Sequence, residues 1–167
     1  MDARCHLRQL RLTVGRGRYR EAQALTQRRQ PDTPAALEIY HGGFGGSSYG
    51  AWWNGEQVVY ESFGESYSAI EQTHVSPSPA QWQRFWRTVD HLHIWDWAPR
   101  YEPGERFEPN GVVRDGVYWS ITLEHAGRRL ESSGDGAGPD SMELDESPGF
   151  VGLLDALSRL LGGRAFS

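Results

Sequence analysis

The stretch from Ser78 to Trp119 constrains the fold more than any other, because it holds five of the seven tryptophans. Ser78, Pro79 and Gln81 match a capping box with proline at the first helical position, a pattern that begins α-helices. The apolar residues that follow lie three or four apart, at Trp82, Phe85, Trp86, Val89 and Leu92. This spacing predicts one helix that runs to about His93 and buries a single face.

The end of the same stretch predicts a strand. Apolar and polar residues alternate over Val117–His125, which is typical of a strand with one buried face. An Ala-Gly turn follows, and the chain is expected to return through residues 128–133 as the second strand of a hairpin. In that register Glu124 lies opposite Arg129, an opposite-charge pair that stabilises neighbouring strands.

A second hairpin is predicted where Asn54-Gly55 joins residues 49–53 to residues 56–63. Asn-Gly favours the two-residue turn whose twist suits a hairpin, and such a turn would place Trp53 opposite Glu56. The residues expected on the buried face are Tyr49, Ala51, Val58 and Tyr60. An alternating strand at Leu37–His41 precedes this hairpin, and the sequence allows one more short strand near residues 69–75.

A second helix is expected to begin at Ser147-Pro148 and to end at Gly162-Gly163. Its apolar face is expected to comprise Phe150, Val151, Leu154, Leu157 and Leu161, with Leu153 and Leu160 beside them. The elements together predict an α+β fold in the order β-β-β-α-β-β-α. About five antiparallel strands built from hairpins would form one sheet, with the two helices packed on one face.

Residues 1–34 differ in charge from the rest of the chain. They hold eight arginines against three acidic residues, whereas the remaining residues hold nine arginines against nineteen acidic ones. Three interpretations remain open: a flexible extension, an arm that grips an acidic surface, and an overlong translated start. We expect an Arg-rich flexible extension over 1–34 and a single α+β domain over 35–167.

Composition narrows the class of protein. No run of 18 apolar residues is present, which argues against a membrane span, and no secretory signal is recognised. The single Cys5 excludes an internal disulfide framework. All seventeen basic residues are arginine, which indicates GC-rich bacterial codon usage, and the net charge of −5 disfavours nucleic acid as a partner. A cytoplasmic bacterial protein is the expectation.

Two sequence motifs resemble the catalytic motifs of esterases. Residues 41–44 (HGGF) look like an oxyanion loop, and Ser48 lies at the centre of a formal G-x-S-x-G match. In esterases the nucleophile lies between a strand and a helix, far from the oxyanion loop. Here the motifs abut and a predicted hairpin follows, so the glycines are interpreted as a turn and no catalytic residue is assigned.

Metal ligation is not expected either. His91, His93 and Asp96 form the one plausible ligand cluster, but the two histidines would diverge on a helix and converge only if it ended at Leu92. The acidic segment 135–146 lacks the spacing of a calcium loop and is interpreted as solvated. Neither a metal nor a cofactor is therefore predicted.

The remaining aromatic residues provide the candidate binding residues. Trp52 is expected on the sheet face opposite the core, with Val59 near it, and the others follow the first helix. The full set comprises Trp52, Trp95, Trp97, Arg100 and Tyr101. Exposed together, such side chains suit contact with a protein, a peptide or a sugar. The competing interpretation is that Trp95 and Trp97 plug the end of the core.

The chain also resembles small bacterial α+β domains to which no activity is assigned. The resemblance rests on W-D-W at 95–97, Tyr101, D-G-V-Y-W-S-I at 115–121, R-R at 128–129 and the closing Leu-rich helix, and covers residues 35–162. It implies a fold and no mechanism.

Three functions remain open from the sequence. The leading hypothesis is a non-enzymatic binding or protein-interaction domain, with another protein as partner and no membrane contact. The second is a small hydrolase or metal-dependent enzyme that uses His41, His91 or His93 with carboxylates. The third is contact with nucleic acid through residues 1–34.

Overall fold

The computed structural model describes residues 32–43, 46–64, 68–102, 117–141 and 144–166. The chain divides into two units, Met1–Thr33 and Pro34–Ser167, and nearly all described residues belong to the second. The extension predicted over 1–34 therefore lies outside the described residues, except for Asp32–Pro34.

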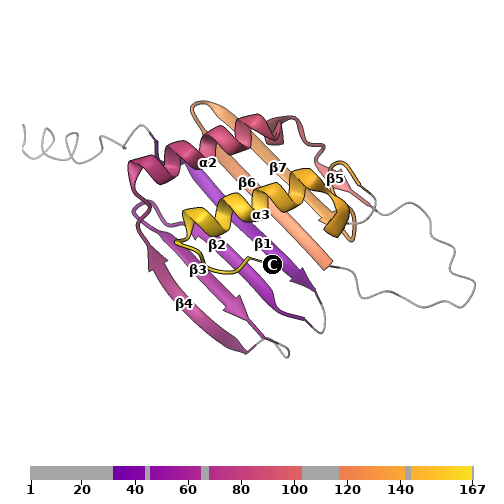
Figure 1. Cartoon of the computed structure of the whole chain (residues 1–167), viewed down its shortest axis with the longest axis horizontal. Coiled ribbons are helices and arrows are strands. Elements are labelled where there is room, and N and C mark those ends of the chain that lie inside the picture. The colour runs from indigo at the N-terminus through magenta and orange to yellow at the C-terminus, as the bar shows by residue number, and fades with distance from the viewer. Residues whose placement is uncertain (1–31, 44–45, 65–67, 103–116, 142–143, 167) are drawn as a thin grey trace, which may run out of the picture. The chain divides into compact units, whose positions relative to one another are not determined.

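The second unit is built on a seven-stranded sheet in the order β4-β3-β2-β1-β6-β7-β5 (Figure 1). The strands are β1 (Ala36–Gly43), β2 (Ser48–Trp53), β3 (Val58–Phe63), β4 (Ala69–Val75), β5 (Arg100–Tyr101), β6 (Val117–His125) and β7 (Arg128–Asp135). All neighbours are antiparallel except β5, which runs parallel to β7. The α+β class is confirmed, but the sheet is mixed and larger than the predicted five antiparallel strands.

Two helices, α2 (Pro79–His91) and α3 (Pro148–Leu160), lie on the same face of this sheet (Figure 1). The capping box predicted for α2 is present, with Ser78 accepting from the Gln81 amide. The described residues also form short 3₁₀ turns at η2 (Ile94–Asp96) and η3 (Leu144–Glu146). The two-layer arrangement follows because each helix has one apolar stripe to bury against the sheet.

The core lies between the helices and the inner faces of the strands. It is rich in aromatic side chains, and Trp119 is 1% exposed with its indole Nε1–H donating to the Ala137 carbonyl at 2.8 Å. The other large, fully buried members include Trp82, Tyr60, Phe85, Ile94, Leu123, Leu153 and Leu157. Burial of Trp82, Trp86 and Trp119 agrees with the sequence periodicity.

The C-terminal hairpin forms as predicted, and Glu124 lies opposite Arg129. The hairpin at Asn54 does not keep the predicted register, because Trp53 pairs with Val58 rather than Glu56. The Asn54 side-chain oxygen accepts the amides of Glu56 and Gln57 at 3.0 and 2.8 Å, which closes a longer turn. The shift is an even number of residues, so the predicted buried face is retained.

Two details of the helices correct the sequence analysis. Helix α2 ends at His91 rather than His93, because His93 adopts the left-handed conformation with a φ of 53°. On α3 the buried face is shifted around the helix from the predicted one: Val151 is 42% exposed, whereas Leu153 and Leu160, expected beside the apolar face, are fully buried. The helix stops where Gly162 and Gly163 adopt positive φ, as expected.

Candidate interaction surface

The face of the sheet opposite the helices is called the outer face. Ala51 on β2 is fully buried toward the helices, so its neighbours Gly50 and Trp52 project from the outer face. The strand register then places Glu38 beside Trp52 on one side and Val59 beside it on the other. Trp52 is half-buried and lies on the face that the sequence predicts for it.

A shallow depression lies where β1, β2 and β6 meet. Its volume is about 350 Å³, and Trp52, Glu38 and Thr122 contribute to its lining from the outer face. The other lining residues are Ala35, Ala36, Leu37 and Trp53. Glu38 is exposed and, within the described residues, makes no ion pair. The Trp52 indole and the Glu38 carboxylate thus line the same depression.

Next to the depression, Gly50 leaves the outer face without a side chain at the centre of β2. Gly50 pairs with Tyr40 of β1 and with Glu61 of β3, and a methyl group added at Gly50 would meet nothing within 4 Å. Tyr40 lies in turn beside Tyr118, with ring centroids 6.2 Å apart. The glycine therefore forms an open floor between aromatic and acidic neighbours.

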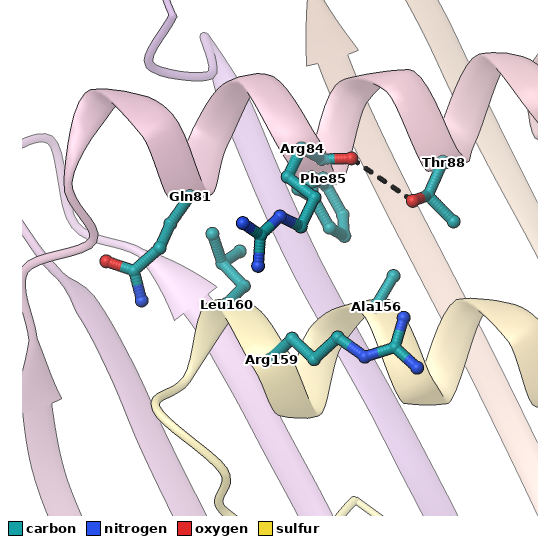
Figure 2. A pocket seen from close by; sticks show the side chains of 7 residues that line it. All are labelled: Gln81, Arg84, Phe85, Thr88, Ala156, Arg159 and Leu160. Carbon is teal, nitrogen blue, oxygen red and sulfur yellow. Dashed lines mark hydrogen bonds between the residues drawn. The ribbon is translucent and has the colours of Figure 1, made fainter.

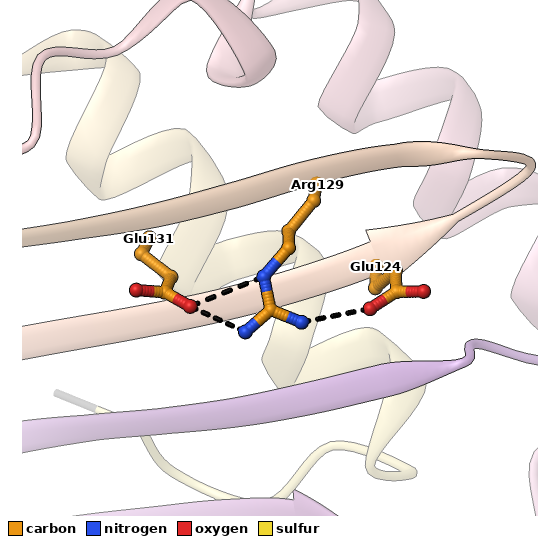
Figure 3. Close-up of polar contacts among 3 residues, drawn as sticks. All are labelled: Glu124, Arg129 and Glu131. Carbon is orange, nitrogen blue, oxygen red and sulfur yellow. Dashed lines mark hydrogen bonds and ion pairs between the residues drawn. The ribbon is translucent and has the colours of Figure 1, made fainter.

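Two carboxylates on another part of the outer face are already paired with an arginine of the domain. Arg129 of β7 donates to Glu124 at 2.8 Å and forms a second ion pair with Glu131 (Figure 3). The three side chains lie on the near side of the strands in that view, with the helices behind. Both pairings raise the pKa of Arg129, with Glu131 the stronger influence. The carboxylates of β6 and β7 shown there are thus less available than Glu38.

Trp95, a second predicted binding residue, is engaged within the domain. Its ring stacks on Trp86 at 6.1 Å, and the Arg128 guanidinium lies 4.5 Å from the ring centroid. Asp90 joins the pair, because its Oδ1 accepts from Trp95 Nε1 at 2.9 Å and from Arg128 Nη1 at 2.7 Å. This cluster connects α2 and η2 to the β6–β7 turn.

Trp97 and Tyr101 pack on a different part of the core. Trp97 meets Trp119 edge-on at 5.8 Å, and Tyr101 stacks on Trp119 at 6.0 Å. The Tyr101 hydroxyl accepts from the Ala98 amide at 2.7 Å. Arg100, the last predicted binding residue, is exposed and pairs with Glu102 at 2.6 Å. Trp95, Trp97 and Tyr101 are half-buried against the core, whereas Trp52 belongs to the outer face.

The groove between the helices is too small for an organic ligand. It is lined by Arg84 and Phe85 of α2 and by Ala156 and Arg159 of α3, with Arg84 and Arg159 extending along its two sides (Figure 2). Its volume of about 20 Å³ accommodates roughly one water molecule. Thr88 closes its far end and donates to the Arg84 carbonyl at 3.1 Å.

The esterase-like motifs do not form a catalytic pair. Ser48 is 1% exposed on the outer face, next to Gly42, where an added Cβ would lie 2.2 Å from the Ser48 hydroxyl. Its hydroxyl finds no hydrogen-bond partner in the described segments. His41 projects from the opposite face, and its Nδ1 lies 3.1 Å from the Phe166 carbonyl. The sheet therefore separates the hydroxyl from the imidazole.

The histidines at the end of α2 lie in solvent. His93 Nδ1 is 3.7 Å from Asp96 Oδ2, and both side chains are about four-fifths exposed. Among the described residues, no three or more His, Cys, Asp and Glu side chains come together as metal ligands. In the same part of the chain, no helix is long and apolar enough to cross a membrane.

Neither the family models, the curated proteins nor the solved structures that were compared with this chain give a match. The resemblance to small bacterial α+β domains therefore stays a prediction. The geometry defines only a general class of protein, an α+β domain with α2 and α3 on one face of the sheet and, among the described residues, no helix on the outer face. Sequence reasoning identified Trp52 but missed Glu38 and Gly50, because pairing across strands brings them together.

Proposed function

We propose that this chain is a protein-interaction domain whose outer face binds a positively charged segment of another protein. The observation that carries the proposal is the position of Trp52 on the outer face, half-buried beside Glu38, whose carboxylate pairs with no described arginine or histidine. Aromatic side chains of this kind supply much of the binding energy at protein interfaces.

Charge favours a basic partner. Among the described residues, the outer face carries five acidic side chains and one arginine, Arg129. The acidic residues are Glu38, Glu61, Glu124, Glu131 and Asp135. An acidic surface attracts a basic segment during diffusion and disfavours acidic ones. The excess of acidic residues over 35–167 acts in the same direction.

Shape favours an extended segment. The outer face has a flat glycine floor at Gly50, bordered by Trp52 and Tyr40 and adjacent to the depression at Glu38. A chain lying over this floor could place alternate side chains against the sheet without displacing a helix. Both helices are on the other face, so the domain need not open to bind.

Site-specific photo-crosslinking in the native host tests this proposal. A photoreactive residue at Ser120, on the outer face, is compared with one at the exposed Gln83 of α2. We expect Ser120 to capture a protein through a basic segment, identified by mass spectrometry, and Gln83 to capture none of it. Trp52→Ala should reduce the adduct about tenfold, the effect of removing a central aromatic contact.

Equal capture from both positions would show non-specific contact and contradict the proposal. So would an adduct whose yield is insensitive to Trp52→Ala, or a captured segment that is acidic.

A further inference from the structure

We infer that the depression at Trp52 and Glu38 is a subsite for the guanidinium group of an arginine side chain. The inference rests on the proposed function and names the chemical group that the outer face recognises. It concerns one indole and one carboxylate, which neighbouring strands hold side by side: Trp52 of β2 lies opposite Glu38 of β1.

The chain contains the same recognition chemistry internally. At the β6–β7 turn, the Arg128 guanidinium lies 4.5 Å from the Trp95 ring centroid and 2.7 Å from the Asp90 carboxylate. Indole and carboxylate together thus hold an arginine at a solvent-exposed position of this fold. Trp52 and Glu38 present the same two groups, and no described arginine pairs with Glu38.

The size and surroundings of the depression suit this group. Its volume of about 350 Å³ admits a whole arginine side chain, and Thr122 adds a hydroxyl at the rim. A guanidinium is planar and weakly hydrated, so it stacks on an aromatic face while its fork of N–H donors reaches a carboxylate. A lysine ammonium lacks both the plane and the fork, and citrulline retains the shape but loses the charge.

Fluorescence anisotropy with three labelled peptides tests the subsite on the full chain. The peptides are short and extended, alternate threonine with arginine, lysine or citrulline, and are otherwise identical. We expect the arginine peptide to bind about tenfold more tightly than the citrulline peptide and several-fold more tightly than the lysine peptide.

Variants then locate the effect. Glu38→Gln should weaken binding of the arginine peptide about three- to tenfold and reduce its advantage over citrulline. The matched control is Asp135→Asn, which removes the same charge from the same face beside Tyr118; its effect should stay below about twofold, since it is distant from the depression. Trp52→Leu should abolish the preference for arginine, and Trp52→Phe should restore part of it.

Two results would overturn the subsite while leaving the proposed function intact. One is equal binding of the arginine and citrulline peptides, and the other is equal weakening by Glu38→Gln and Asp135→Asn. If neither the arginine nor the lysine peptide binds, the proposed function fails and the subsite with it.

Discussion

At the residue scale, two glycines in the sheet have opposite surroundings. Gly50 has open space where a side chain would begin. Gly134 of β7 does not: an added Cβ would lie 2.3 Å from Trp119 Nε1 and 2.6 Å from the Ala137 carbonyl oxygen. Those two atoms form a buried hydrogen bond, so Gly134 lets the strand approach Trp119 closely. Of these two positions, only that of Gly134 has too little space for a side chain.

We therefore expect Gly50→Ala to raise the free energy of unfolding by about 0.5–1 kcal/mol, since glycine loses more backbone freedom on folding. Urea denaturation followed by tryptophan fluorescence measures the change. Gly134→Ala is the matched substitution and should lower stability by about 1–3 kcal/mol through overpacking. A loss of stability in Gly50→Ala would mean that its surroundings are not open.

The residue scale also shows where sequence reasoning reached its limit. Alternation along β2 was enough to assign Trp52 to the outer face, because Ala51 and Tyr49 belong to the core side. Pairing Trp52 with Glu38 requires the β1–β2 register, and the glycine-rich sequence between His41 and Ser48 does not by itself specify that register. The sequence alone therefore predicts the position of Trp52 on the outer face, but not that Glu38 lies beside it.

At the element scale, α3 depends on two side chains at its N-terminus. Ser147 is fully buried, and its hydroxyl donates to Asp140. The same hydroxyl oxygen accepts from the Phe150 amide at 3.4 Å. The other Asp140 oxygen accepts from the Gly149 amide at 2.9 Å. Both acceptors satisfy amides that the helix itself leaves unpaired, and Asp140 adds a favourable charge.

We expect Ser147→Ala to lower the free energy of unfolding by about 1–2 kcal/mol, because the cap is lost and Asp140 loses a buried partner. Ser78→Ala removes the exposed cap of α2 and provides the comparison, with an expected loss of about 1 kcal/mol. Thermal denaturation followed by circular dichroism measures both changes. A smaller loss for Ser147 than for Ser78 would contradict a role for burial.

The elements differ in how readily the sequence predicts them. Helix α2 and the β6–β7 hairpin carry local signals, a capping box and an Ala-Gly turn, that the fold retains. Strand β5 has only two residues and no periodicity, so its pairing with β7 arises from tertiary packing. The longer turn at Asn54 arose because a side-chain oxygen competed with backbone pairing.

At the scale of the whole molecule, the C-terminal residues Arg164–Phe166 connect several strands. Tyr60 donates to the Ala165 carbonyl at 2.8 Å, and Arg164 pairs with Glu71 at 2.9 Å. Phe166 is buried, and its carbonyl bonds to His41. Burial lowers the pKa of His41, although the bond to Phe166 and the charge of Asp145 oppose that effect.

Because the pKa of His41 is lower in the folded state than its ordinary 6.5, the unfolded chain binds more protons just below that value. We expect stability to fall as the pH drops below about 6.5, and to be unaffected by this group at higher pH. Urea denaturation of wild-type protein and His41→Gln between about pH 5 and about pH 8 measures the effect. The variant should lose part of the pH dependence.

The matched control is His74→Gln, which removes an exposed histidine on β4. An equal loss of pH dependence in both variants would contradict a specific role for His41.

The strand order also has a consequence for folding. Strands β1 to β4 and the β6–β7 hairpin each pair between neighbours in sequence, whereas the β1–β6 ladder joins residues 36–43 to residues 117–124. Local pairs close short loops and form early, but this ladder must close a long one. The two halves of the sheet therefore meet late, with β1 and β6 as unpaired edges until they do. In newly made chains, those edges are the positions most exposed to aggregation.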